Sequence, residues 1–280
     1  MKRVGTMGEV MVKKFYVDSS FGQVHVRETK PNKEGIKTKR PVICFHQSPL
    51  SGLQYKIFQE ELGLDRVVWC PDTPGFGGSD SPFHEVTVKN YAEAMIPLFH
   101  KLLEETSYES FDIMGGHTGS VIALELGLIS QNFVNKIILP SVAYFTNSER
   151  VEMKKRFVNE PAYFSDSNFV SKTYIDSVLN INTPVSKSRR LELFTERLRS
   201  GLNAWFAPNA VTSYDADDAL RRTSHQVLIL VLEDMLSENS FKASKVLKDC
   251  IVRDMRHISH DLAWDVEFKS IIKEIKLFLD

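Results

Sequence analysis

A short glycine-rich stretch at residues 115–119, with the sequence GGHTG, places a histidine where it could do chemistry. The stretch follows an apolar run and precedes a helical pattern, and such a Gly-x-Xaa-x-Gly frame is typical of a sharp turn that presents a nucleophile. Serine, cysteine or aspartate is expected at the central position, but here it holds His117. Because an imidazole titrates near pH ~6.5, it can act as a nucleophile or as a general base.

Other residues suited to such chemistry follow further strand-like, apolar runs. They are His46, Gln47 and Ser48 after an early run, Glu233 and Asp234 after a late one, and His257 and His260 before the final helical pattern. A carboxylate can fix the tautomer of a histidine, and backbone N–H groups can stabilise a developing oxyanion. The combination therefore indicates acyl transfer, or proton transfer beside a carbonyl group.

The elements that would position these residues alternate along the chain. Strands are expected at 14–18, 23–28, 41–45, 66–70, 111–114, 136–139, 226–232 and 250–254. Helices are expected at 54–62, 87–105, 117–129 and 268–279, and Pro97 should kink or split the second of them. This alternation predicts an α/β fold with a mostly parallel sheet.

A different composition marks the stretch 148–218, which is helical in pattern, charged and aromatic, with no clear strand. We expect it to form a helical lid, at about residues 145–222, inserted in a single domain that spans residues 1–280. Some of its aromatic side chains would pack the lid and others would line an apolar pocket.

The order of these pieces resembles the α/β-hydrolase family, and the resemblance covers nearly the whole chain. Family members often read D-L-V-G-H-S-M-G-G-A-I-A-L-E at the turn, and residues 112–125 read D-I-M-G-G-H-T-G-S-V-I-A-L-E without a gap. This register places His117 on the family's nucleophilic serine, whereas a shift by one residue would put Ser120 at the last glycine of the turn. The resemblance implies an eight-stranded, mostly parallel sheet with helices on both faces and the lid after the sixth strand.

The same resemblance implies partners for His117 in the loops that follow the later strands. His257 matches the histidine before the last helix and would act as the base, with His260 as a second candidate. Asp234 would be the acid that fixes the tautomer of His257. Glu233 is the alternative acid, because the chain is one residue short of the usual G-x-x-D pattern at this position.

The oxyanion hole implied by the resemblance consists of the backbone N–H groups of Ser48 and Thr118. Ser48 also brings a hydroxyl group close to the turn. His46 lies just before this loop, and we expect it to brace the loop rather than to act as a catalyst.

Composition and charge limit the partners and the compartment. The 280 residues carry a formal net charge of −1, which gives no basic footprint for nucleic acid or an anionic membrane. We expect no membrane span, because the sequence has no apolar run of about 18 residues. We expect no signal peptide, because the first 15 residues contain no apolar segment. The three cysteines form no CxxC pair and are expected to be reduced, which predicts a cytoplasmic protein. No cofactor motif is present, a small molecule is the expected partner, and the oligomeric state stays open.

These observations favour a hydrolase that acts on a small, partly apolar ester or related carbonyl compound, with His117 as nucleophile or base. Three alternatives remain open. The residues could run proton-transfer chemistry, as in a lyase, isomerase or decarboxylase. The scaffold could bind a ligand without turnover. Alternatively His117 and His257, with His46, could chelate a metal.

Overall fold

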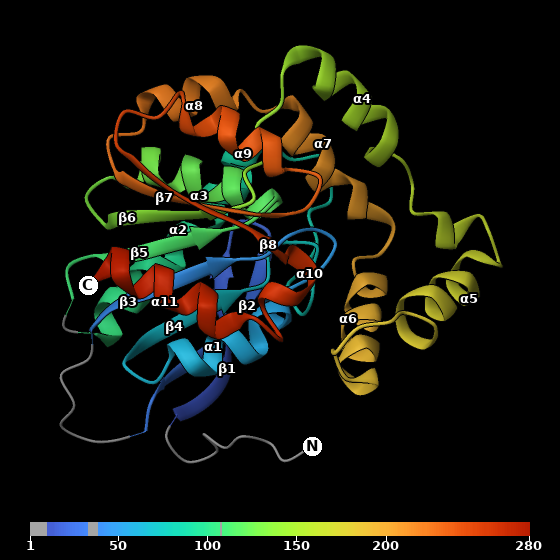
Figure 1. Ribbon diagram of the computed structural model, residues 1–280, viewed down its shortest axis with the longest axis horizontal. Coiled ribbons are helices and arrows are strands. Elements are labelled where there is room, and N and C mark those ends of the chain that lie inside the picture. Colours follow the sequence, from blue (N-terminus) through green and yellow to red (C-terminus); the bar gives the residue numbers. More distant parts are fainter. Residues whose placement is uncertain (1–9, 33–38, 107) are drawn as a thin grey trace.

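The computed structural model describes residues 10–32, 39–106 and 108–280. Its centre is an eight-stranded sheet with the strand order β1-β2-β4-β3-β5-β6-β7-β8 (Figure 1). β2 pairs antiparallel with both β1 and β4, and the remaining neighbours are parallel. The strands are β1 (Val10–Ser19), β2 (Gly22–Pro31), β3 (Lys39–Phe45), β4 (Arg66–Pro71), β5 (Phe111–Gly115), β6 (Val134–Pro140), β7 (Gln226–Glu233) and β8 (Cys250–Ser259). The predicted eight-stranded, mostly parallel α/β sheet is thus confirmed.

Helices cover both faces of this sheet, and each face has its own apolar core. One face is covered by α2 (Val88–Glu105), α3 (Thr118–Ile129) and α9 (Ser237–Ser244), and the other by α1 (Lys56–Leu62), α10 (His260–Ala263) and α11 (Phe268–Leu279). The short 3₁₀ helix η1 (Gly52–Tyr55) precedes α1. Pro97 lies inside α2, which continues through it, so the predicted split does not occur.

The segment between β6 and β7, which the structure describes throughout, contains helices and no strand. Its elements are α4 (Asn147–Phe157), η2 (Ala162–Phe164), α5 (Phe169–Tyr174), the π-helix η3 (Ile175–Leu179), α6 (Lys187–Arg199), η4 (Leu202–Trp205), α7 (Phe206–Ser213) and α8 (Ala216–Arg222). In Figure 1, α4, α5 and α6 lie to one side of the sheet. By contrast, α7 and α8 bury Phe206, Ala210 and Leu220 in the main core, so the predicted lid range of 145–222 includes two helices that belong to it.

Strand β8 is longer than predicted, and this difference affects the site. The apolar run indicated a strand at 250–254, but β8 continues to Ser259 and pairs with β7 as far as Glu233. The register between the two strands shifts after Leu232. As a result, His257 lies within the strand, and His260 is the first residue of the helix that follows it.

The helices and the cysteines bear on two further expectations from the sequence. In the part of the chain that the structure describes, none of the helices has the length and apolar character of a membrane span. Cys44, Cys70 and Cys250 are all free, as predicted. The first nine residues, on which the expectation of no signal peptide partly depends, lie outside the described residues.

The turn between β5 and α3 depends on close backbone contacts that only glycine permits. A Cβ atom on Gly119 would lie 2.2 Å from the carbonyl oxygen of Phe45, and one on Gly115 would lie 2.0 Å from the carbonyl oxygen of Gly119. Both contacts are with backbone, which cannot turn aside as a flexible side chain can. The glycines therefore allow β3, β5 and α3 to meet at the turn.

We expect Gly119→Ala to lower the free energy of unfolding by about 3 kcal/mol or more, because overpacking against backbone is hard to relieve. Urea denaturation measures this change. Gly201→Ala is a suitable control, since Gly201 has φ +65° but open space around its Cα, so only the backbone cost of roughly 1–2 kcal/mol applies. Equal losses in the two variants would contradict the account of the turn.

Candidate active site

His117 occupies a strained turn at the junction of β5 and α3. Its backbone has φ 51° and ψ −120°, a conformation that residues other than glycine adopt rarely and at a cost of about 1–3 kcal/mol. Hydrogen bonds on both sides hold it there. The His117 N–H donates to the carbonyl oxygen of Ser141 (2.9 Å), and the Ser120 hydroxyl donates to the carbonyl oxygen of His117 (2.6 Å). The turn thus presents the His117 side chain at the carboxyl edge of the parallel strands, where α/β sheets bind ligands.

Asp234, in the loop after β7, contacts the His117 ring directly. Its Oδ2 lies 3.0 Å from His117 Nε2, and its Oδ1 accepts the Leu236 N–H at 2.7 Å. Burial disfavours the charged carboxylate, but the hydrogen bond and charge of His117, with smaller contributions from Ser141 and His260, lower the pKa of Asp234 below its usual value. An ionised carboxylate can only accept, so a neutral His117 carries its proton on Nε2 and leaves the Nδ1 lone pair free.

The second ring beside His117 belongs to His260, at the start of α10. The two ring centroids are 4.5 Å apart, and His260 is only 4% exposed. Burial and the adjacent His117 lower the pKa of His260 well below its ordinary value, so this imidazole is neutral at neutral pH. Its Nε2 atom is buried and has no hydrogen-bond partner among the described residues.

His257, which the resemblance assigned as the base, does not join this group. Its side chain is exposed on β8 and lines a surface hollow with Asp254, Lys273 and Glu274. The structure therefore does not bring His257 to the turn, because β8 extends through that position, and His260 is the histidine that lies beside His117. Of the two candidate acids, Asp234 contacts the His117 ring, whereas Glu233 is the exposed last residue of β7.

The two backbone N–H groups assigned to an oxyanion hole are available in the structure. The N–H groups of Ser48 and Thr118 donate no hydrogen bond within the described ranges. Both residues are partly exposed, and the Ser48 hydroxyl is buried without a partner among those same residues. Thr118 is the first residue of α3, so its N–H is one of the free donors at a helix start.

His46 braces the loop that carries Ser48, as expected from the sequence. It is fully buried, its Nε2 accepts the Thr73 N–H at 2.8 Å, and its Nδ1 donates to the carbonyl oxygen of Gln47 at 2.9 Å. Both ring nitrogens are therefore engaged, and His46 is not free to bind a metal with His117. Burial outweighs the nearby charges of Asp72 and Glu196 and lowers the pKa of His46.

The lowered pKa of His46 predicts a specific loss of stability in acid. Below about pH 6.5 the unfolded chain protonates this histidine while the folded chain does not, so the free energy of unfolding falls as the pH falls. Urea denaturation between pH 7 and pH 5 should show a steeper fall in the wild type than in His46→Gln. The difference in slope approaches about 1.4 kcal/mol per pH unit, the value for one proton. His84→Gln, at an exposed histidine, should match the wild type, and parallel slopes for His46→Gln and the wild type would contradict the prediction.

Two residues that the sequence analysis did not assign help to build the site. Ser141, after β6, has φ 58° and accepts the His117 N–H. Arg189 of α6 is buried and binds the carbonyl oxygens of Leu53 and Gln54 at 2.9 Å each and Asp265 at 2.8 Å. It thus ties the inserted segment to η1, which follows the Ser48 loop, and to the residues after α10. For Ser141, the available signal in the sequence was a polar residue directly after a strand. For Arg189 there was none, because it is one of four arginines in a charged helix.

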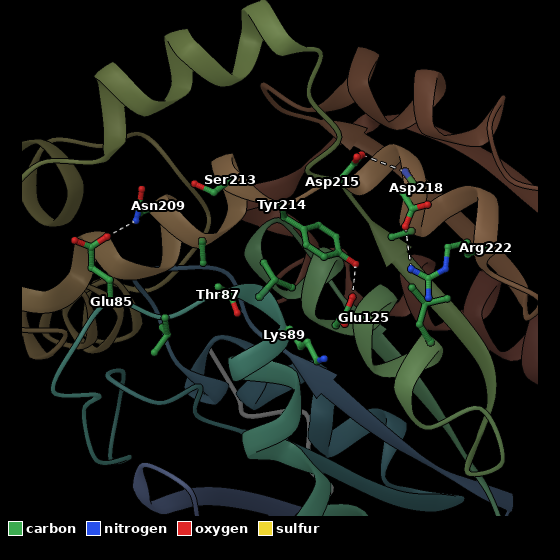
Figure 2. A pocket seen from close by; sticks show the side chains of 15 residues that line it. Glu85, Thr87, Lys89, Glu125, Asn209, Ser213, Tyr214, Asp215, Asp218 and Arg222 are labelled. Carbon is green, nitrogen blue, oxygen red and sulfur yellow. Dashed lines mark hydrogen bonds and ion pairs between the residues drawn. The ribbon is translucent and has the colours of Figure 1, made fainter.

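A separate hollow of about 400 Å³ lies between the start of α2 and helices α3, α7 and α8 (Figure 2). Its polar groups are mostly paired with each other. Figure 2 shows Tyr214 directed at Glu125 and Asn209 directed at Glu85, each at 2.8 Å. No residue of the group around His117 lines this hollow, so we place the candidate active site at the turn and not here.

Comparison with known proteins agrees with this architecture. The family model described as "alpha/beta hydrolase fold" matches residues 40–201, more than half of the chain. The chain therefore belongs to the α/β-hydrolase fold family, which confirms the resemblance drawn from the turn. No curated protein matches the sequence.

Solved structures similar to this chain include hydrolases of several kinds. An esterase from Exiguobacterium antarcticum has a TM-score of 0.73 at 15% identity, with 94% of this chain and 100% of that chain covered. An esterase from Thermogutta terrifontis has a TM-score of 0.70 at 17% identity, covering 96% and 100%. An epoxide hydrolase from Vigna radiata has a TM-score of 0.71 at 13% identity, covering 97% and 99%. At these identities the likeness concerns the fold alone, so function must be argued from the site.

Proposed function

We propose that the protein is a hydrolase of a small, partly apolar ester or related carbonyl compound, in which His117 acts as the general base. The observation that carries this proposal is the placement of His117 in the nucleophile position of the turn with Asp234 hydrogen-bonded to its Nε2. A histidine oriented by a buried carboxylate is a recurring device for taking a proton from an attacking group.

The hydrogen bond to Asp234 favours base catalysis over attack by the ring itself. With Nε2–H donating to the carboxylate, the free lone pair is on Nδ1. Nδ1 is bonded to Cγ, the ring carbon that carries Cβ. It is therefore hindered as a nucleophile toward a carbonyl carbon, but it can still accept a proton. We therefore assign the attack to a water molecule, whose proton passes to Nδ1 as its oxygen bonds to the carbonyl carbon.

Charge that develops on the carbonyl oxygen would be stabilised by the N–H groups of Ser48 and Thr118, whose donors are free in the structure. When the tetrahedral adduct collapses, the bond to the leaving alkoxide breaks and the proton on Nδ1 passes to that oxygen. His260 packs against the His117 ring and limits its orientation. Helix α6, whose Arg189 binds Leu53 and Asp265, would bound the substrate space as part of a lid.

A second candidate function is proton abstraction beside a carbonyl group, without hydrolysis. It is favoured by the fact that the turn carries a carboxylate-oriented imidazole where a hydroxyl or thiol nucleophile would otherwise stand. The same N–H groups would then stabilise an enolate.

One set of assays separates the two candidate functions. Purified protein should release p-nitrophenolate from short p-nitrophenyl esters faster than the uncatalysed rate, and His117→Ala should reduce that release to near background. Incubation in deuterated water with simple carbonyl compounds tests the alternative by mass spectrometry. Ester turnover that is absent, or equal in both proteins, refutes the hydrolase, and deuterium incorporation that depends on His117 would establish the proton-transfer enzyme in its place.

A further inference from the structure

A group of three potential metal ligands lies at the turn, and it differs from the set that the sequence suggested. His117, Asp234 and His260 each offer one ligand atom, and these atoms all lie within 4.8 Å of one another. They come from three separate elements: the turn after β5, the loop after β7 and the start of α10. The sequence had pointed instead to His257 and His46. The structure places His257 in a surface hollow, and His46 already accepts a hydrogen bond from the Thr73 N–H.

From this group we infer a binding site for one divalent transition-metal ion, with the donor set typical of zinc, held by His117, Asp234 and His260. Two imidazoles and one carboxylate are a ligand set that zinc uses in enzymes, with a further position left for water. The inference goes beyond the proposed function and does not depend on it, because binding can be measured without any substrate. The metal would replace the proton on His117 Nε2 that is shared with Asp234 in the metal-free protein, so the two proposals describe different states of the site.

The geometry of the group is close to what such an ion requires. Ligand atoms about 2.0–2.1 Å from a tetrahedral zinc lie roughly 3.3 Å from one another. His117 Nε2 and Asp234 Oδ2 are already 3.0 Å apart. Since no ligand-atom separation in the group exceeds 4.8 Å, a shift of at most roughly 1.5 Å by the His260 ring completes the site.

The state of His260 is a second, independent observation that points to a ligand. Its side chain is 4% exposed and its Nε2 has no hydrogen-bond partner among the residues that the structure describes. A buried polar atom without a partner costs about 1–3 kcal/mol, and such atoms are rare in folded proteins. Coordination of a metal by this ring would give the buried His260 nitrogen a partner and so remove the cost of leaving it unpaired.

Two of the three proposed ligands are partly exposed to solvent. The side chains of His117 and Asp234 are 23% and 11% exposed, so an ion can reach them from solvent. The Asp234 carboxylate supplies an acidic oxygen ligand to the group, which favours a divalent cation. A metal held by three protein ligands at a partly exposed position retains an open coordination position, as catalytic sites do and structural sites do not.

The inference is tested by zinc titration of the full-length protein after removal of metal with a chelator. Isothermal titration calorimetry with zinc chloride at pH 7.5 should give one tight site per chain. His260→Ala and His117→Ala should each weaken that site by more than about 100-fold, since even residues that only orient a ligand cost 10–100-fold. His257→Ala is the matched control, because it removes an exposed histidine three residues from His260 and should bind zinc as the wild type does.

Cobalt provides a second readout that does not require His260→Ala to fold. Addition of Co²⁺ to the wild type should give the visible absorption bands of a four- or five-coordinate ion, and Asp234→Asn and His117→Ala, both at partly exposed positions, should lose them. Zinc binding by the wild type no tighter than by these variants, or lost equally in His257→Ala, would overturn the site. Neither result touches the ester assay, so failure of the metal site and failure of the proposed hydrolase are distinguishable.

Discussion

Replacement of Asp234 by asparagine is expected to lower kcat/KM for ester hydrolysis by about 10²–10⁴-fold, because a base in the wrong tautomer loses the contribution of general-base catalysis. Asp234 is ionised and accepts the Nε2–H of His117 at 3.0 Å. An asparagine amide that turns its N–H₂ toward the ring would instead donate to Nε2. The ring proton would then sit on Nδ1, the atom that must accept the proton from water.

This prediction has a neighbouring control. Glu233→Gln removes the exposed carboxylate one residue earlier, at the end of β7, and should leave kcat/KM within about 2-fold of the wild type. Steady-state kinetics at several pH values measures both variants, with circular dichroism as a check on folding. An Asp234→Asn variant that is folded and as active as Glu233→Gln would show that the carboxylate does not orient the base.

Conversion of His117 to serine is expected to produce the second large effect, a gain of covalent reactivity. The backbone of position 117 already has the strained conformation of a nucleophile turn, and the N–H groups of Ser48 and Thr118 donate no hydrogen bond within the described residues. Removal of the imidazole frees Asp234 from its hydrogen bond and leaves His260 as the nearest base. The three groups would then have the chain order and roles of a Ser–Asp–His hydrolase.

The measurement is labelling with a fluorophosphonate probe that reacts with activated serines. His117→Ser should be labelled close to stoichiometrically at position 117, whereas the wild type should show only background. The double variant His117→Ser/His260→Ala removes the base and should return labelling to background. A folded His117→Ser variant that is not labelled, or labelling that survives loss of His260, would contradict the assignment of His260 to the third position of the frame.

Much of the fold follows from local sequence patterns because inner strands such as β5 and β7 are continuous apolar runs. The run 226–232 corresponds to β7, and the run 111–114 corresponds to β5, each within one residue of the observed end. The glycines of the turn also carry strong information, since Gly115 and Gly119 sit where backbone segments meet. The position of His117 was predictable for that reason, as the frame of glycines fixes which residue takes the strained conformation.

Which of His257 and His260 lies beside His117 was not predictable in this way. After Asp254, the exposed Arg256 and His257 separate the buried Met255 and Ile258, so no continuous apolar run marks the last part of β8. The pairing of β8 with β7 decides where the strand ends. The predicted strand ends at residue 254, five residues before β8 ends at Ser259, and for this reason the expected base was His257 rather than His260. The hydrogen bond between Asp234 and His117 was also not predictable from the sequence. It depends on the length and direction of the His117 side chain, and the spacing of residues in the chain does not indicate either.

The central claim is that His117, held by Asp234 in the nucleophile position, performs the chemistry. It is tested most directly by the ratio of kcat/KM between His257→Ala and His117→Ala on the same p-nitrophenyl ester. We expect a ratio of about 10² or more, because general-base catalysis contributes 10²–10⁴-fold and the exposed His257 contributes nothing. A ratio near one, with both proteins folded and active, would contradict the account.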